Sequence, residues 1–460
     1  GMRIPIFLEG VAQVKLKLSK QIRLREEPFG SFIYFRNSQK VARLNQIETL
    51  IAKSFSNSRN KNDVVSIIAR DLNGELLQVD KIVNQFKEKR ILITVNDLPV
   101  SFHEIEWKRL LEKQDEIKKN KPFSSPVWMH IQPWTVCNLE CKHCYCFASP
   151  HGTTSHLSED QWYQVIDDFA KLDVFEMFIT GGEVLIDERF WKIASYARKK
   201  DMVIRTTTNG TLIKEDTPHR LVYELGIDKI QVSLDGATSD THDPFRGRQG
   251  AFDRTIKGIK RLRKVLDVSL EVTMHQLNYH EVEQIVALAA GLGCCEVKFV
   301  NIFPTGRGFQ VFKNYQLSSI QKLELLDKYQ ELEVKFPEVK LSYGSNCNDI
   351  TQKDSSICTA GVIGANIDER GNVLPCIMGI SLKSLYAGNV LDRSFSDIWF
   401  FSSILQKMRH LPEEPGASCS TCSWRVECKS RCSVIAHTTA QAPCHLSPAN
   451  PQSHFSIGSV

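Results

Sequence analysis

The chain has 460 residues, of which 42% are hydrophobic and 24% charged, a composition typical of folded proteins and a length that favours several domains over one core. The net charge of +5 comes without a long Lys/Arg block, so we expect no nucleic-acid partner. We also expect no membrane segment, because no apolar run reaches the roughly 18 residues that a spanning helix needs. Residues 1–18 are too charged for a secretion signal, which favours a cytoplasmic location where the 14 cysteines stay reduced and available for metal.

Residues 1–98 predict a small α+β unit with a winged-helix-like layout. Strand-forming residues at 22–37 and 40–45 surround a turn signal at 28–30. Three amphipathic helices follow, with apolar faces within 47–55, 64–72 and 79–86. A winged helix can also bind DNA, but the third helix is only modestly basic, which argues against that alternative.

Residues 99–125 predict a polar helix and a basic linker, a domain boundary. From 126 to 315, strand and helix patterns alternate. The six predicted strands lie within 127–135, 175–183, 202–210, 229–236, 269–275 and 296–304. Six such units imply a parallel sheet with right-handed crossovers, two units short of a closed (β/α)8 barrel. We therefore predict an α/β fold with an open, partial (β/α)6 TIM-like barrel, in which Ser158 and Gln161 begin the first helix as a capping box.

The remaining chain has three predicted parts. Residues 316–345 form a bridging helix, residues 346–445 a cysteine-rich domain with few periodic elements, and residues 446–460 a tail. A loop-rich domain without a large core needs another source of stability, and metal clusters would supply it.

Unusual polar sequences follow the predicted barrel strands. They are CNLECKHC after the first strand, GGE after the second, TTNG after the third, SLDG after the fourth and PTGRG after the sixth. In parallel α/β sheets and barrels, ligands bind at the carboxyl ends of the strands. These loops are therefore expected to share one rim.

Cys137, Cys141 and Cys144 have the spacing C-x3-C-x2-C, which lets a short loop wrap one metal unit with three thiolates. A structural zinc site takes four ligands, so three close cysteines suit a [4Fe–4S] cluster with one open iron. His143 or Cys146 could complete a zinc site, and spacing alone leaves that alternative open.

The cysteine motif after the first strand and GGE after the second resemble the radical S-adenosylmethionine (SAM) superfamily. This resemblance implies that the open iron chelates the amino and carboxylate groups of SAM. One electron then cleaves SAM to a 5′-deoxyadenosyl radical, which abstracts hydrogen from a substrate.

The same resemblance implies a set of SAM contacts. Gly181, Gly182 and Glu183 match the segment that binds the amino group, although Val184 stands where the family usually has proline. The other implied contacts are Thr208 and Asn209 at a strand end, Ser233 and Asp235 for the ribose, and Arg246 for the carboxylate. The alternatives are a polar strand-end turn for Ser233 and Asp235, and a surface residue at a helix entry for Arg246. No further catalytic side chain is assignable.

The C-terminal cysteines resemble the SPASM extension, which implies two auxiliary [4Fe–4S] clusters and so three clusters in all. The implied ligands are Cys358, Cys376 and Cys432 for the first, and Cys419, Cys422, Cys428 and Cys444 for the second. Cys347 would complete the first set, or else leave an open iron for a substrate thiolate. A zinc ribbon on Cys419 and Cys422 is the alternative.

Residues 1–98 resemble the peptide-recognition (PqqD-like) domain fused to many peptide-modifying radical SAM enzymes, which takes up a leader peptide as an added strand. Together, these resemblances imply a radical SAM oxidoreductase that installs a thioether or carbon–carbon cross-link in a ribosomally made precursor peptide. Flavodoxin or ferredoxin would supply electrons. The alternatives are a sulfatase formylglycine maturase, a peptide epimerase and a non-catalytic zinc adaptor.

Overall fold

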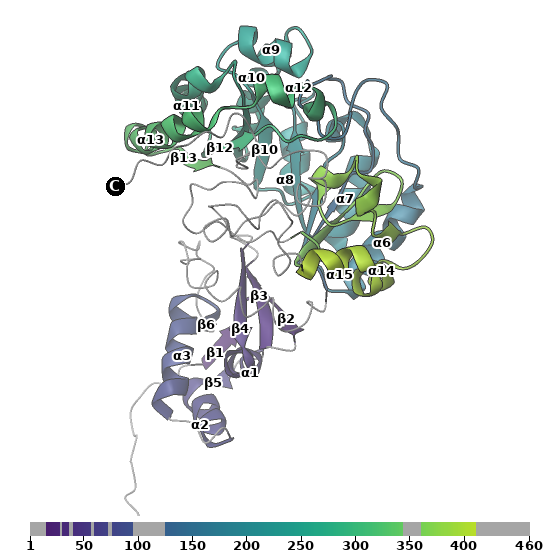
Figure 1. Cartoon of the computed structure of the whole chain (residues 1–460). Helices are drawn as coiled ribbons and strands as arrows, with labels where there is room; N and C mark the ends of the chain where they lie inside the picture. The colour runs from purple at the N-terminus through teal and green to yellow at the C-terminus, as the bar shows by residue number, and fades with distance from the viewer. Residues whose placement is uncertain are drawn as a thin grey trace, which may run out of the picture. The chain divides into compact units, whose positions relative to one another are not determined.

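The computed structural model describes residues 15–27, 30–35, 40–56, 59–71, 76–94, 125–343 and 360–410. The chain divides into two compact units, residues 1–119 and residues 120–460, and each is considered by itself (Figure 1). The helix predicted within 99–125 lies outside the described residues. So do seven predicted ligands: Cys347, Cys358, Cys419, Cys422, Cys428, Cys432 and Cys444.

The first unit contains two small antiparallel sheets. One has the order β2-β3-β4, with β2 at Ile22–Glu27, β3 at Gly30–Phe35 and β4 at Lys40–Asn45. The other has the order β5-β1-β6, with β5 at Arg59–Asn60, β1 at Lys15–Leu18 and β6 at Leu92–Thr94. The sequence did not predict β1 or β5, because strands of four and two residues show too little alternation to be recognised.

The three predicted helices of the first unit are confirmed. They are α1 at Gln46–Ser54, α2 at Lys61–Asp71 and α3 at Leu76–Glu88. Asn45 begins α1 through a capping box, since its side chain accepts from the Glu48 amide at 2.9 Å while Glu48 accepts from the Asn45 amide at 2.8 Å. Ile33, Phe55 and Val83 are fully buried where the helices meet the sheets.

The second unit is built on one sheet with the order β13-β12-β11-β10-β9-β8-β7-β14-β15-β16. Strands β7 to β12, all parallel, confirm the six predicted: Trp128–Ile131, Glu176–Ile179, Val203–Thr208, Lys229–Ser233, Asp267–Met274 and Glu296–Asn301. Four further strands extend the sheet: β13 at Lys340–Tyr343, β14 at Gly364–Ile367, β15 at Asn372–Leu374 and β16 at Gly388–Asn389. Strand β14 pairs in parallel with β7, so part of the predicted 346–445 domain shares the barrel sheet.

Helices connect these strands. They are α6 at Glu159–Lys171, α7 at Arg189–Lys199, α8 at Thr217–Tyr223, α9 at Ser239–Arg246, α10 at Ala251–Leu262, α11 at Val282–Gly291, α12 at Arg307–Tyr315, α13 at Ser319–Lys335, α14 at Phe395–Phe401 and α15 at Ser403–His410. Short 3-10 turns lie at Val184–Ile186, Tyr279–Glu281, Ile377–Gly379 and Lys383–Leu385. The capping box of α6 is confirmed, because Ser158 Oγ accepts from the Gln161 amide at 3.2 Å. Helices α9 and α12 were not predicted.

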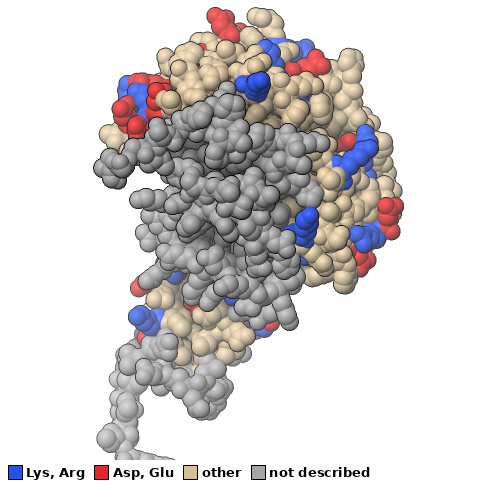
Figure 2. Space-filling view, in the orientation of Figure 1, with Lys and Arg blue, Asp and Glu red and all other residues tan. Residues whose placement is uncertain are grey.

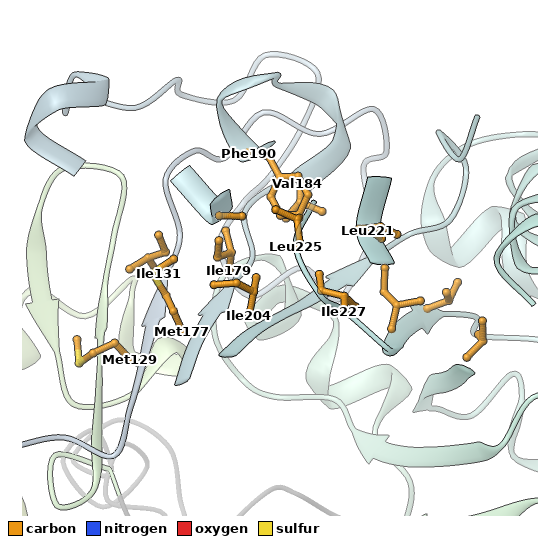
Figure 3. Packing of buried hydrophobic residues seen from close by; sticks show 14 of the residues in the cluster. Met129, Ile131, Met177, Ile179, Val184, Phe190, Ile204, Leu221, Leu225 and Ile227 are labelled. Carbon is orange, nitrogen blue, oxygen red and sulfur yellow. The ribbon is translucent and has the colours of Figure 1, made fainter. Parts of the chain in front are cut away.

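The core of the second unit lies between the sheet and its helices (Figure 3). Met129 and Ile131 of β7 and Met177 and Ile179 of β8 are fully buried there. Each such side chain contributes about 1.5–3 kcal/mol of transfer free energy. Because side chains alternate along a strand, the residues between them face the opposite side of the sheet.

Helix α14 lies beside α6 in Figure 1, and Phe395 meets Phe169 edge-to-face with ring centroids 5.1 Å apart. Acidic and basic side chains are interspersed on the visible face of the described residues (Figure 2), as expected from pairs such as Lys192–Glu159 at 2.9 Å. Within the described ranges, no helix has the length and apolar character to cross a bilayer.

Replacing Phe190 with alanine should lower the free energy of unfolding by about 3–5 kcal/mol, because the change opens a cavity in the core of the second unit. Phe309→Ala is the matched control, since that ring is 62% exposed. Chemical denaturation measured by circular dichroism should show a lower midpoint for Phe190→Ala alone. Equal midpoints for the two variants would contradict the packing of α7 against the sheet.

Candidate active site

Cys137, Cys141 and Cys144 lie on the loop that follows β7, and all three side chains line one cavity of about 630 Å³. Cys137 and Cys141 are buried, and Cys144 is partly buried. The structure therefore brings the three predicted cluster ligands together along one cavity.

Each of the three sulfurs faces hydrogen-bond donors. The Leu139 amide lies 3.4 Å from Cys137 Sγ, and the Ala148 amide lies 3.3 Å from Cys144 Sγ. Cys141 Sγ lies 3.8 Å from Arg246 Nη1. Donors around thiolate sulfurs are typical of iron–sulfur ligands, whose potential they tune. The donor set thus fits a cluster held by these thiolates.

Burial raises the pKa of Cys137 to about 12 and that of Cys141 to about 11. For Cys144, a hydrogen bond from Cys146 lowers the pKa to about 6, and the two sulfurs lie 3.7 Å apart. Because metals bind thiolates, loading the site must release protons from the two buried thiols.

His143 is engaged away from the cysteines. Its ring stacks on Phe245 with centroids 4.5 Å apart, and its Nε2 lies 3.6 Å from Asp235 Oδ2. Burial lowers the pKa of His143 to about 3, so the ring is neutral. In the parts of the chain that the structure describes, no three His, Cys, Asp or Glu side chains converge on a single metal ion. The position of His143 argues against this residue as the fourth zinc ligand, whereas Cys146 Sγ lies 3.7 Å from Cys144 Sγ.

The GGE loop lies directly against the strand end that leads into the cysteine loop. The Gly182 amide donates to the Trp134 carbonyl at 2.9 Å, and a Cβ on Gly182 would lie 2.0 Å from the Val136 carbonyl oxygen. Trp134 Nε1 donates to the Glu183 carbonyl at 3.1 Å, a positioning role that the sequence did not reveal. Any side chain at Gly182 would push the two loops apart.

Glu183 is 2% exposed and is held by the next strand end. Its carboxylate accepts from Thr208 Oγ1 at 2.6 Å and from the Asn209 amide at 2.8 Å. Burial raises the pKa of Glu183 despite these donors. Thr208 and Asn209, predicted as SAM contacts, therefore also fix the carboxylate of the GGE loop.

Arg246 is buried, so the alternative of a surface residue at a helix entry is wrong. Its Nε lies 2.7 Å from Asp235 Oδ2, and Asp235 Oδ1 accepts from the Thr273 amide at 2.8 Å. Although burial opposes ionisation, the guanidinium holds the pKa of Asp235 below its ordinary value. Ser233 lines the cavity, whereas Asp235 is fully buried behind it as the partner of Arg246.

Helix α9 holds Arg246 against the cysteine loop. Two carbonyls of its last turn accept hydrogen bonds from amides of that loop. The Phe245 carbonyl accepts from the Lys142 amide at 2.9 Å, and the Arg246 carbonyl accepts from the Glu140 amide at 3.3 Å. Gly247 ends the helix at φ 72, with the Glu140 carbonyl only 2.4 Å from where a Cβ would stand. Helix α9, between β10 and α10, therefore holds the cysteine loop in place through backbone hydrogen bonds.

Two further segments reach the site. Arg307, from PTGRG, donates from Nε to the Cys141 carbonyl at 2.8 Å and from Nη2 to the Ala148 carbonyl at 2.6 Å. Cys376, the one predicted auxiliary ligand among the described residues, directly precedes Ile377 and Met378, which line the cavity. Cys294 is buried in the core of the second unit and lies outside the cavity lining.

The deep part of the cavity is lined from β8 to β12 by polar side chains. Arg205 Nη2 lies 2.8 Å from Glu176 Oε1, and Lys298 Nζ lies 3.7 Å from Glu271 Oε2. Val297 and Phe299, on either side of Lys298, are fully buried in the core. The inward face of the sheet therefore forms a charged lumen below the cysteine loop.

Comparison with known families matches the radical SAM superfamily over residues 131–289 and the SPASM iron–sulfur cluster-binding domain over residues 358–423. The chain carries a radical SAM domain followed by a SPASM domain. The matched segments contain the three thiols, the GGE loop and Arg246. The open cavity beside the thiols suits SAM as the missing ligand of such a cluster.

Relatives of this radical SAM protein have several activities. The AdoMet-dependent heme synthase of Methanosarcina barkeri is 27% identical over 64% of this chain and 87% of its own length. The mycofactocin maturase MftC of Mycolicibacterium smegmatis is 28% identical over 67% of this chain and 78% of its own length. Streptococcus suis SuiB bound to precursor peptide SuiA has the same fold, with a TM-score of 0.69 at 16% identity, covering 96% of this chain and all of SuiB.

Gly182→Ala should weaken SAM binding at least tenfold, because the added methyl collides with the Val136 backbone. Gly291→Ala is the matched control, since a Cβ there meets no atom within 4 Å. Equilibrium dialysis of SAM against the iron-loaded, anaerobic proteins measures the effect. Unchanged affinity in Gly182→Ala would show that the GGE loop does not shape the SAM site.

Proposed function

We propose that the chain is a maturase that installs a thioether or carbon–carbon cross-link in a ribosomally synthesised precursor peptide. The observation that carries this proposal is the continuous cavity, which begins at three donor-surrounded thiols and extends into a charged lumen. Substrate in the lumen would lie directly beside SAM. The names of MftC, a maturase, and of SuiB, bound to a precursor peptide, support the same substrate class.

A tetrapyrrole substrate is the second candidate, because one relative is named as a heme synthase. The cavity of about 630 Å³ lined by described residues lies within the roughly 300–1,000 Å³ range of small-molecule sites. The peptide substrate is preferred over the tetrapyrrole because MftC is named a maturase and the SuiB structure holds a precursor peptide. A cross-link is distinguished from an epimerised residue by the loss of two hydrogens from the peptide.

In the proposed reaction, the residues of the chain bind and orient. A bound [4Fe–4S] cluster with SAM supplies one-electron reduction and the radical that removes a substrate hydrogen. Arg246 would hold the SAM carboxylate and Ser233 the ribose, while the fully buried Asp235 fixes Arg246. Forming the cross-link removes a second hydrogen as a proton and an electron, so an electron acceptor is required.

We assign that acceptor role to the two auxiliary clusters held by the C-terminal cysteines, which makes three clusters per chain. Cys376 supports this assignment, since its neighbours Ile377 and Met378 line the substrate cavity. Flavodoxin or ferredoxin would return electrons to the first cluster. With four irons in each cluster, metal analysis should find stoichiometric iron for three clusters and no zinc.

The first unit is proposed to bind the leader of the precursor peptide as an added strand. Its β2-β3-β4 sheet and flanking helices suit such a role, and the likeness to SuiB extends over 96% of the chain. The core of the peptide would then reach the lumen while the leader stays held.

Cys141→Ala should abolish the modification of a co-expressed precursor peptide, because the cluster loses one of three ligands. The peptide to co-express is one encoded by a short open reading frame found next to this gene, and mass spectrometry should show a loss of two hydrogens with the unaltered protein. Cys295→Ala, a half-buried cysteine outside the cavity, is the control and should retain the modification. An unchanged peptide mass with the unaltered protein would contradict cross-linking, and modification by Cys141→Ala would contradict the cluster assignment.

A further inference from the structure

Among the residues that the structure describes, three cationic side chains line the cavity: Arg205, Arg246 and Lys298. Arg205 and Arg246 lie 2.8 and 2.7 Å from their carboxylate partners, Glu176 and Asp235. Lys298, in contrast, lies farther from its nearest carboxylate oxygen than either arginine does.

The ammonium of Lys298 has one charge contact, 3.7 Å to Glu271 Oε2, which is beyond hydrogen-bond distance. That same oxygen already accepts a hydrogen bond from Gln231 Nε2. Among the described residues, Lys298 makes no hydrogen bond, and its side chain is 29% exposed within the lumen.

An ammonium carries three donors, and that of Lys298 has no protein acceptor within hydrogen-bond distance among the described residues. A carboxylate is the ligand that best satisfies them, because charge-assisted N–H···O bonds are short and strong. Glu271 is turned toward Gln231, so a carboxylate from outside could approach Lys298 without breaking a hydrogen bond of the protein.

The position of Lys298 in its strand sets the depth of such a ligand. Lys298 precedes Asn301, the last residue of β12, by three positions, which is about 10 Å along a strand. The cysteine loop lies at the carboxyl edge of the same sheet. A carboxylate on Lys298 would therefore sit below the reacting atom by the length of one or two amino-acid residues.

We propose that Lys298 is a specificity-determining residue that anchors a carboxylate of the substrate, one or two residues from the atom that reacts. The peptide origin of this carboxylate rests on the proposed function. Its source is either an Asp or Glu side chain of the acceptor segment or the C-terminus of the peptide.

Ligand-observed NMR on the iron-loaded, SAM-bound full chain tests this directly with defined probes. N-acetyl-aspartic acid N-methylamide offers only a side-chain carboxylate, N-acetyl-alanine only a terminal one, and N-acetyl-asparagine N-methylamide neither. At least one carboxylate probe should bind tenfold or more tightly than the asparagine probe. The stronger of the two identifies the source.

Lys298→Met should remove this preference, while Lys298→Arg should retain it within about threefold, because arginine keeps the charge. Lys260→Met, at an exposed position of α10, is the matched control and should behave like the unaltered chain. Circular dichroism and iron content verify that each variant is folded and loaded.

Equal affinity for all three probes, no binding of either carboxylate probe, or a preference that survives in Lys298→Met would each overturn the proposal. Preferential binding of coproporphyrin III, with neither peptide probe bound, would replace the peptide carboxylate with a tetrapyrrole one. Because peptide modification is measured separately, an unaltered chain that modifies the peptide but shows no carboxylate preference would refute the anchor and leave the proposed function standing.

Discussion

The site depends on one buried guanidinium. Arg246 joins a carboxylate of the fourth strand end, Asp235, to the sulfur of Cys141, and it is carried by the helix whose last turn hydrogen-bonds to the cysteine loop. A buried charge is costly unless it is paired, and removing one partner is strongly destabilising. Asp235 therefore fixes the rotamer of Arg246, and Arg246 in turn fixes the position of the cysteine loop against the barrel.

The parallel sheet supplies the rest of the cavity, because residues of its strands line the space beside the cysteine loop. Because side chains alternate along each strand, β8 to β12 send one set of residues into the core with Met177 and Val297 and the other set into the lumen with Arg205 and Lys298. The carboxyl ends of β7, β8 and β10 present the cysteine loop, GGE and SLDG at one rim. One backbone arrangement thus supplies stability, the cofactor site and the substrate chamber.

Much of this arrangement could be predicted from the sequence, because its signals are local. The six strands show clear apolar runs, the Ser158 capping box marks α6, and the cysteine spacing is a chemical motif in itself. What could not be predicted depends on contacts between distant segments. Strand β14 is only four residues, and it pairs with β7 more than 230 positions earlier.

The same reason explains the site residues that were missed or reinterpreted. Helix α9 contains Pro244, a residue that argues against a helix, so the docking of its last turn on the cysteine loop was not foreseen. Trp134 and Arg307 act through hydrogen bonds to backbone carbonyls, and such contacts leave no motif. The pairing of Asp235 with Arg246 likewise has no signature in the SLDG motif, because a motif names a residue type and not its partner.

In the proposed function, the three thiols would hold a cluster whose open iron binds SAM inside this cavity. The most direct test is electron–nuclear double resonance on the reduced cluster with SAM labelled with ¹⁵N at its amino group. A ¹⁵N hyperfine coupling should be present in the full chain and absent in Cys141→Ala. A cluster signal without that coupling, or stoichiometric zinc in place of iron, would contradict this proposal.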